Sequence, residues 1–213
     1  MDYRKLLNIT RDSPVFSSSF LLAGRGTANS LRRQLDRWVK SGRLIQLRRG
    51  VYSVAPPYRA EAPHPFLVAN HLRKPSYVSL QSALSYYGMI PEFVPVTTSV
   101  TTGRPEKLET PLGDFVFRHL KKTAFFGFAE TEISRGPSAF LASPEKALLD
   151  LLYLTPGSDS SEYLEELRFE PADDFDWKAL RRHVERLKSA KLQRAMEFLS
   201  RVTAGKSDRE LKK

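Results

Sequence analysis

The sequence predicts an α+β fold in two parts, and three observations support this prediction. Residues 28–40 place apolar side chains at the spacing of one helix face. Two short segments rich in aliphatic and aromatic residues, 44–47 and 51–54, follow directly and are typical of a β-hairpin. After a proline-rich stretch, helical patterns and β-branched strand patterns occupy a longer second part.

The helix of the first part is expected to begin after Thr27, whose hydroxyl is a typical N-cap, and to stop before Gly42. Leu31, Leu35 and Trp38 form its apolar stripe. A cationic helix face is either merely solvated or a surface for a polyanion, and the hairpin that follows favours the second interpretation. The face opposite the apolar stripe carries Asn29, Arg32, Arg33 and Arg37.

The elements around this helix complete a recognisable order. Helices are expected over residues 2–10 and 15–22, and a glycine-containing turn with Arg25 leads into Thr27. The hairpin tip is Arg48-Arg49-Gly50. This order predicts a winged helix-turn-helix, with the third helix in the major groove and the hairpin on the backbone or minor groove. The candidate DNA contacts are Arg25, Thr27, Asn29, Arg32, Arg33, Arg37, Arg48 and Arg49.

The charge distribution supports the same interpretation. The chain has a formal net charge of +10, and residues 1–55 hold eleven Lys and Arg against three Asp and Glu. Residues 56–213 are nearly balanced, with 23 cations against 21 acids. The excess charge therefore lies in the first part, where it predicts a salt-dependent contact with a polyanion.

A proline-rich segment, residues 56–64, is expected to link residues 1–55 to a mixed α/β domain over residues 65–213, because proline ends both helices and strands. Ser143-Pro144-Glu145 predicts the start of a central apolar helix. The other elements expected in the second part are helices over residues 64–72, 79–87, 177–187 and 192–202, and strands over residues 94–102, 115–120, 125–133 and 138–142.

Catalytic, metal and cofactor sites are not predicted. The chain has no cysteine, which excludes thiol chemistry and disulfides. Asp114, Glu130 and Glu132 lack the Glu-x-Lys pattern expected of a metal-dependent nuclease, and His64 and His71 have no acid placed to complete a metal site. No segment approaches the roughly 18 apolar residues of a membrane helix. We expect a cytoplasmic protein without catalytic activity.

The C-terminal helices carry a second set of cations at helical spacing. These side chains form either a solvated amphipathic face or a second surface for DNA, RNA or a protein partner. The members of this set are Arg181, Arg182, Arg186, Lys188, Lys191 and Arg194.

Several motifs together resemble the AbiEi family of antitoxins, which belong to type IV toxin–antitoxin systems of phage abortive infection. The segment from Arg37 to Leu44, continued by Arg49 to Tyr52, resembles the family's helix-to-wing signature. The second part adds the motifs Tyr77 to Gly88, Thr97 to Gly103, and Ser143 to Asp150, in the family's order.

This resemblance implies a transcriptional autorepressor whose first domain binds inverted repeats of double-stranded DNA at its own promoter. It also implies that the second domain counteracts a cognate nucleotidyltransferase-like toxin. We expect a monomer in solution that pairs on palindromic DNA. The rival interpretation is an inhibitor that directly caps its toxin, with DNA binding secondary, and a regulator with a ligand-sensing domain is a further alternative.

Overall fold

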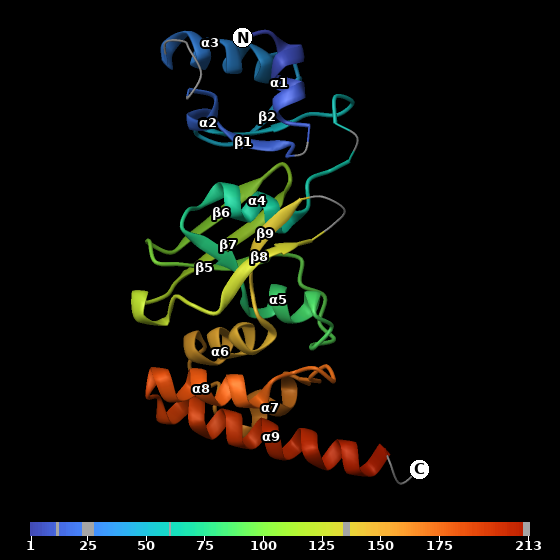
Figure 1. Cartoon of the computed structure of the whole chain (residues 1–213), viewed down its shortest axis with the longest axis vertical. Coiled ribbons are helices and arrows are strands. Elements are labelled where there is room, and N and C mark those ends of the chain that lie inside the picture. Colours follow the sequence, from blue (N-terminus) through green and yellow to red (C-terminus); the bar gives the residue numbers. More distant parts are fainter. Residues whose placement is uncertain (12, 23–27, 60, 134–136, 211–213) are drawn as a thin grey trace.

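The computed structural model describes the backbone of residues 1–11, 13–22, 28–59, 61–133 and 137–210. The α+β chain is elongated along one axis (Figure 1). The first part forms one end, a large mixed sheet lies in the middle, and the C-terminal helices form the opposite end (Figure 1). The α+β class expected from the sequence is confirmed.

The first part packs helices on one face of a small antiparallel sheet with strand order β1-β3-β2. Leu6, Leu35, Trp38 and Tyr52 are buried together between the helices and this sheet. The elements are α1 (Tyr3–Ile9), β1 (Val15–Ser17), α2 (Ser18–Leu22), α3 (Ala28–Lys40), β2 (Leu44–Arg48) and β3 (Val51–Val54).

One sequence expectation for this part is wrong. Residues 15–22 were expected to be a single helix, but Val15–Ser17 is a strand that pairs with β3, and the helix begins only at Ser18. The reason is long-range pairing: Val15 lies opposite Ser53, and Phe16 lies opposite Tyr52. The spacing of the apolar residues alone does not reveal this partner.

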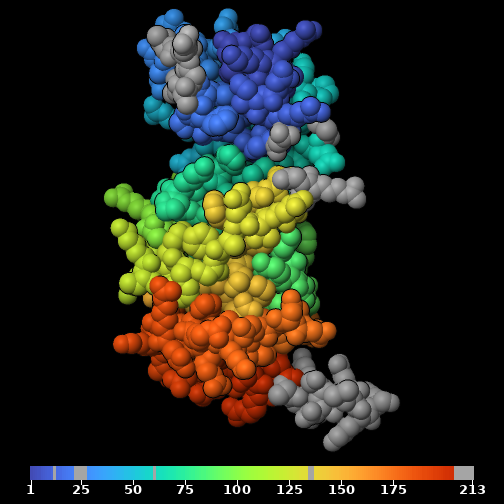
Figure 2. Space-filling model, in the orientation of Figure 1, coloured from blue at the N-terminus to red at the C-terminus, as the bar shows by residue number. Residues whose placement is uncertain are grey.

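The small sheet is covered on its second face by the rest of the chain. Val15, Leu47 and Val51 belong to the same buried cluster as Phe66 and Leu72 of the second part. The space-filling view accordingly shows the two parts in contact rather than joined by an extended strand of chain (Figure 2). The proline-rich segment therefore connects two parts that share a hydrophobic core.

The second part is built on a mixed sheet with strand order β6-β7-β5-β4-β9-β8. Four of its elements, β4, β6, η1 and α7, were not expected from the sequence. Its elements are α4 (Pro65–Leu72), β4 (Ser76–Val78), α5 (Leu80–Tyr86), β5 (Thr97–Thr101), β6 (Glu106–Thr110), β7 (Gly113–His119), η1 (Lys122–Ala124), β8 (Phe128–Glu132), β9 (Ser138–Ala142), α6 (Pro144–Leu154), α7 (Ser161–Glu166), α8 (Trp177–Leu187) and α9 (Ala190–Glu210).

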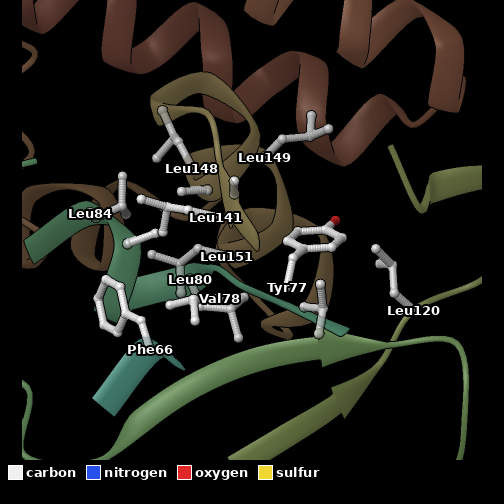
Figure 3. Packing of buried hydrophobic residues seen from close by; sticks show 14 of the residues in the cluster. Phe66, Tyr77, Val78, Leu80, Leu84, Leu120, Leu141, Leu148, Leu149 and Leu151 are labelled. Atoms are coloured by element: carbon white, nitrogen blue, oxygen red, sulfur yellow. The ribbon is translucent and has the colours of Figure 1, made fainter. Parts of the chain in front are cut away.

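Helix α6 is the centre of the second part, as its apolar sequence predicts. The Ser143 hydroxyl accepts a hydrogen bond from the Lys146 backbone N–H, and Pro144 occupies the first turn, so the predicted helix start is confirmed. Leu148, Leu149 and Leu151 belong to the same buried cluster as Val78 of β4 (Figure 3). Beyond α6, α8 and α9 complete the same buried cluster at the far end.

Candidate nucleic-acid interface

Helix α3 presents its cations outward because its apolar stripe is fixed to the core. Leu35 and Trp38 are buried, whereas Arg32, Arg33 and Arg37 are exposed. The helix ends where the sequence predicts. Gly42 adopts φ +68°, and its N–H and that of the next residue donate to the Val39 and Trp38 carbonyls at 3.0 and 2.9 Å. This is the geometry of a Schellman stop, which favours glycine.

The exposed arginines of α3 are not engaged in ion pairs with other side chains of the described residues. Within the described residues, no hydrogen bond or ion pair joins Arg32, Arg33 or Arg37 to another side chain. Asn29 is likewise exposed, one turn closer to the start of the helix. Exposed guanidinium groups on one helix face offer hydrogen-bond donors to an external acceptor, such as a phosphate oxygen or a guanine edge.

The hairpin that follows places its two arginines in different environments. Gly50 forms the turn with φ +83°, and its carbonyl accepts a hydrogen bond from the Ser18 N–H at 2.8 Å, so the tip is attached to α2. Arg49 is exposed at this tip. Arg48 is half-buried: it donates to the Leu72 carbonyl at 2.8 Å and lies 3.3 Å from Glu106 of the second part. Both arginines were expected to contact DNA, but only Arg49 remains directed to solvent.

A hollow joins the helix to the hairpin. Its volume is about 450 Å³, and Arg32 from α3 and Arg49 from the hairpin both line it. Asp36 is the acidic side chain on the same wall. The fold thus brings a helix cation and a hairpin cation to one concave surface, although they lie 17 positions apart in the sequence. The other lining residues are Ser18, Ala28, Leu31, Leu35, Gln46, Gly50 and Tyr52.

Two of the expected DNA contacts cannot be placed. Arg25 and Thr27 lie outside the described residues. The remaining expected contacts in this region, apart from Arg48, are exposed on α3 or at the hairpin tip.

The C-terminal cations are mostly engaged within the chain. Arg194 makes two hydrogen bonds to the Asp159 carboxylate, at 2.6 and 2.9 Å. Lys191 donates to the carbonyls of Tyr153 and Thr155. These contacts give Arg194 and Lys191 a structural role within their own end of the chain. Of the other members of the set, Arg182 approaches Asp176 at 3.5 Å, Arg186 lies over the Phe126 ring at 3.9 Å, and Arg181 and Lys188 line a hollow between α8 and α9.

The motifs of the second part meet at a buried polar centre. Asp150 accepts hydrogen bonds from the Tyr77 hydroxyl at 2.9 Å and the Ser79 hydroxyl at 2.8 Å, and it forms an ion pair with Lys146 one turn earlier on α6. The side chains of Lys146 and Asp150 are 0% and 1% exposed. The Tyr77 and Phe126 rings lie within 5.6 and 5.0 Å of the Lys146 ammonium.

Burial governs the protonation equilibria of this centre. Removal from water lowers the pKa of Lys146 and raises the pKa of Asp150, and their mutual attraction opposes both shifts. Burial and the adjacent Asp150 carboxylate also raise the pKa of Tyr77 above its ordinary value. Because every member is paired and enclosed, the geometry is that of a structural polar core connecting β4 to α6.

This centre was missed at the sequence level, although a signal existed. Lys146 and Asp150 stand four positions apart in an otherwise apolar helix, which is the spacing of an intrahelical ion pair. Glu145, which the sequence places at the start of the same helix, is also buried, and it accepts a hydrogen bond from the Asp176 backbone N–H at 3.0 Å.

The histidines of α4 have structural positions. The His64 Nδ1 accepts a hydrogen bond from the Phe66 N–H at 3.2 Å and so caps α4. Burial, with a smaller effect of Lys74, lowers the pKa of His71 to about 4. In the described part of the chain, no group of three or more His, Asp or Glu side chains is arranged to hold a metal ion. The described helices are all too short or too polar to cross a membrane.

Comparisons with known proteins agree with this arrangement. Residues 4–55 match a family model described as "Transcriptional regulator, AbiEi antitoxin". Among solved structures, the chain is similar to the crystal structure of the RV2827C protein from Mycobacterium tuberculosis, with a TM-score of 0.52 and 18% sequence identity over 92% of this chain and 75% of that chain. At that identity the likeness shows the fold alone, and no curated protein matches the chain. The resemblance read from the sequence is therefore confirmed over residues 4–55, which match the AbiEi antitoxin family of transcriptional regulators.

Proposed function

We propose that this chain is a DNA-binding transcriptional autorepressor whose first part is a winged helix-turn-helix. The observation that carries the proposal is the set of exposed cations on α3, which form no ion pair with the described residues, together with Arg49 on the shared hollow. Helix α3 enters the major groove, where arginines and Asn29 reach base edges or phosphates, and the hairpin tip lies along the backbone. The element order α1-β1-α2-α3-β2-β3 supports the winged form.

The position of the first part in the molecule supports the same proposal. Helix α3 lies at the end of the long axis, with its sheet and the whole second part on its inner side (Figure 1). A duplex that approaches this end meets α3 without obstruction from the central sheet. The α8 and α9 helices lie at the other end of the molecule, so they are remote from a duplex bound by α3 (Figure 1).

The second part is proposed to act as an antitoxin module without catalytic activity, working in the cytoplasm against a cognate nucleotidyltransferase-like toxin. The family described for residues 4–55 and the second-part motifs support this assignment. The separation of α3 from α8 and α9 allows DNA and a protein partner to be bound at the same time. We further propose a monomer that pairs on the inverted repeats of its own promoter.

A gel shift on the region upstream of its own gene tests the DNA-binding proposal. We expect a sequence-selective shift that the triple variant Arg32→Ala, Arg33→Ala, Arg37→Ala loses. A matched control removes three exposed cations at the opposite end, with Arg181→Ala, Arg182→Ala and Lys188→Ala, and should bind like the wild type. A selective shift that survives the α3 substitutions would refute the assignment of α3 as the reading helix.

Co-elution with the product of the neighbouring gene tests the rival mode of action, in which the second part caps the toxin directly. A stable complex that forms while the promoter is not shifted would favour that rival. A promoter shift without a stable complex favours the autorepressor that counteracts the toxin indirectly.

A further inference from the structure

A cavity of about 540 Å³ lies in the second part, in a place that the sequence motifs do not mark. Within the described residues, β4 and β9 are paired in parallel at Val78 and Leu141, and the cavity lies beside the N-terminal ends of these two strands. Helix α4 and the aromatic residues before and within β8 complete the walls. The lining residues are Leu67, Asn70, His71, Lys74, Pro75, Ser76, Phe125, Phe128, Glu130, Ser138, Ala139 and Phe140.

On both sides of the cavity, side chains form hydrogen bonds with backbone groups in or next to β4 and β9. The Asn70 carboxamide accepts a hydrogen bond from the Phe140 N–H and donates one to the Phe140 carbonyl at 3.5 Å. On the β4 side, the Thr101 hydroxyl donates to the Pro75 carbonyl at 2.7 Å. Because these groups already have partners, the gap needs no further backbone pairing to remain open.

The back of the cavity is an ordered aromatic wall. The Phe128 ring is stacked on Tyr77 with centroids 4.3 Å apart, and it meets Phe125 and Phe140 edge-on at 5.0 and 6.0 Å. Tyr77 is itself fixed by its hydrogen bond to Asp150. Flat rings held at stacking and edge-on angles form a surface that suits another flat ring.

Among the described residues that line the cavity, the two charged side chains at its border have opposite signs. Lys74 and Glu130 are both exposed and carry opposite charges. His71 is uncharged near neutral pH, because burial and Lys74 hold its pKa at about 4. A cavity of several hundred Å³ with mainly apolar walls and a few polar groups is typical of a small-molecule site. With no net charge on the described lining residues, the walls favour an uncharged ligand over a strongly anionic or cationic one.

We propose that this cavity is a binding site for a small, uncharged, planar aromatic molecule, which stacks against Phe128 and Phe140 and makes hydrogen bonds with the polar groups at the border. One wall of the site is α4, and the Leu72 carbonyl at the end of α4 holds Arg48 of the hairpin. The site therefore lies against the helix that supports the DNA-binding part.

Fluorescence titration of the full chain with N-phenyl-1-naphthylamine tests the proposal, because this probe is uncharged, carries a flat naphthyl ring and is fluorescent in apolar surroundings. We expect saturable binding of one probe per chain. Ser138→Phe adds a ring at a half-buried lining position, occupies part of the cavity, and should raise the Kd by about tenfold. Phe140→Ala removes one aromatic wall at a position that is 46% exposed, so it tests the site even if the first variant folds poorly.

Phe93→Ala is the matched control, because Phe93 is 89% exposed and would attract the probe nonspecifically to the surface. Binding should be unchanged in this variant. The proposal is overturned if the wild type shows no saturable binding. It is equally overturned if the folded Ser138→Phe and Phe140→Ala variants bind the probe as the wild type does, or if Phe93→Ala abolishes binding.

Discussion

Asp150→Ala is expected to destabilise the protein far more than any exposed ion-pair substitution. The change leaves the buried Lys146 ammonium without its counter-ion and leaves the Tyr77 and Ser79 hydroxyls without their acceptor. Breaking a buried pair on one side costs about 3–5 kcal/mol of the free energy of unfolding. With a urea dependence near 2 kcal/mol per M, the unfolding midpoint should fall by about 2 M.

Urea unfolding followed by circular dichroism measures this shift, and two variants calibrate it. Arg194→Ala breaks the surface pair with Asp159, in which the arginine and aspartate side chains are 61% and 19% exposed, and should lower the midpoint far less than Asp150→Ala does. Lys146→Met with Asp150→Asn removes both charges while the Asn oxygen still accepts from the two hydroxyls, so it should cost less than Asp150→Ala alone. A midpoint for Asp150→Ala close to that of Arg194→Ala would refute the structural role of the buried centre.

Two further predictions concern single side chains. The pKa of His71 is lowered to about 4 in the folded protein, so the unfolded chain binds one more proton between about pH 6.5 and pH 4; stability should fall as the pH drops through this window, by up to about 3 kcal/mol. Thermal unfolding of His71→Gln should show a flatter acid limb, and a limb identical to that of the wild type would contradict the assignment. Arg49→Ala should reduce the salt slope of DNA binding by about 0.9, whereas Arg48→Ala should leave the slope unchanged and lower stability by about 1 kcal/mol. Fluorescence anisotropy at several salt concentrations separates the two, and equal slopes for both variants would contradict the division of roles.

The elements that the sequence predicts well are those with local signals. Helix α3 has an apolar stripe and a glycine stop, and α6 has a Ser-Pro start, so local sequence signals are enough to place both. The cations of α3 follow from the same periodicity, because fixing the apolar stripe fixes which side chains face solvent.

The features that the sequence does not reveal depend on distant partners. Val15–Ser17 becomes a strand because β3 lies beside it, and Glu106–Thr110 pairs with β7 although its residues are mostly polar. Arg48 is diverted from the hairpin tip by the Leu72 carbonyl and Glu106, 24 and 58 positions away. A local sequence pattern does not reveal contacts between residues that lie so far apart in the chain.

The aromatic cavity is a candidate site that local sequence patterns likewise do not reveal. Its walls come from α4, β4, β8 and β9 and from the segment before β8, and no one of these segments carries a binding motif. The sequence leaves a ligand-sensing regulator only as a further alternative, because no convergent polar set is visible in it. The cavity arises only when the segments meet around the gap between β4 and β9.

The salt dependence of promoter binding tests the central claim most directly. The affinity of the wild type and of the variant Arg32→Ala, Arg33→Ala, Arg37→Ala, Arg49→Ala would be measured by fluorescence anisotropy across a salt series. If all four cations contact phosphates, the slope of log affinity against log salt should flatten by about 3.6, which is roughly 0.9 per lost contact. An unchanged slope, with affinity retained in the variant, would contradict DNA binding by α3 and the hairpin tip.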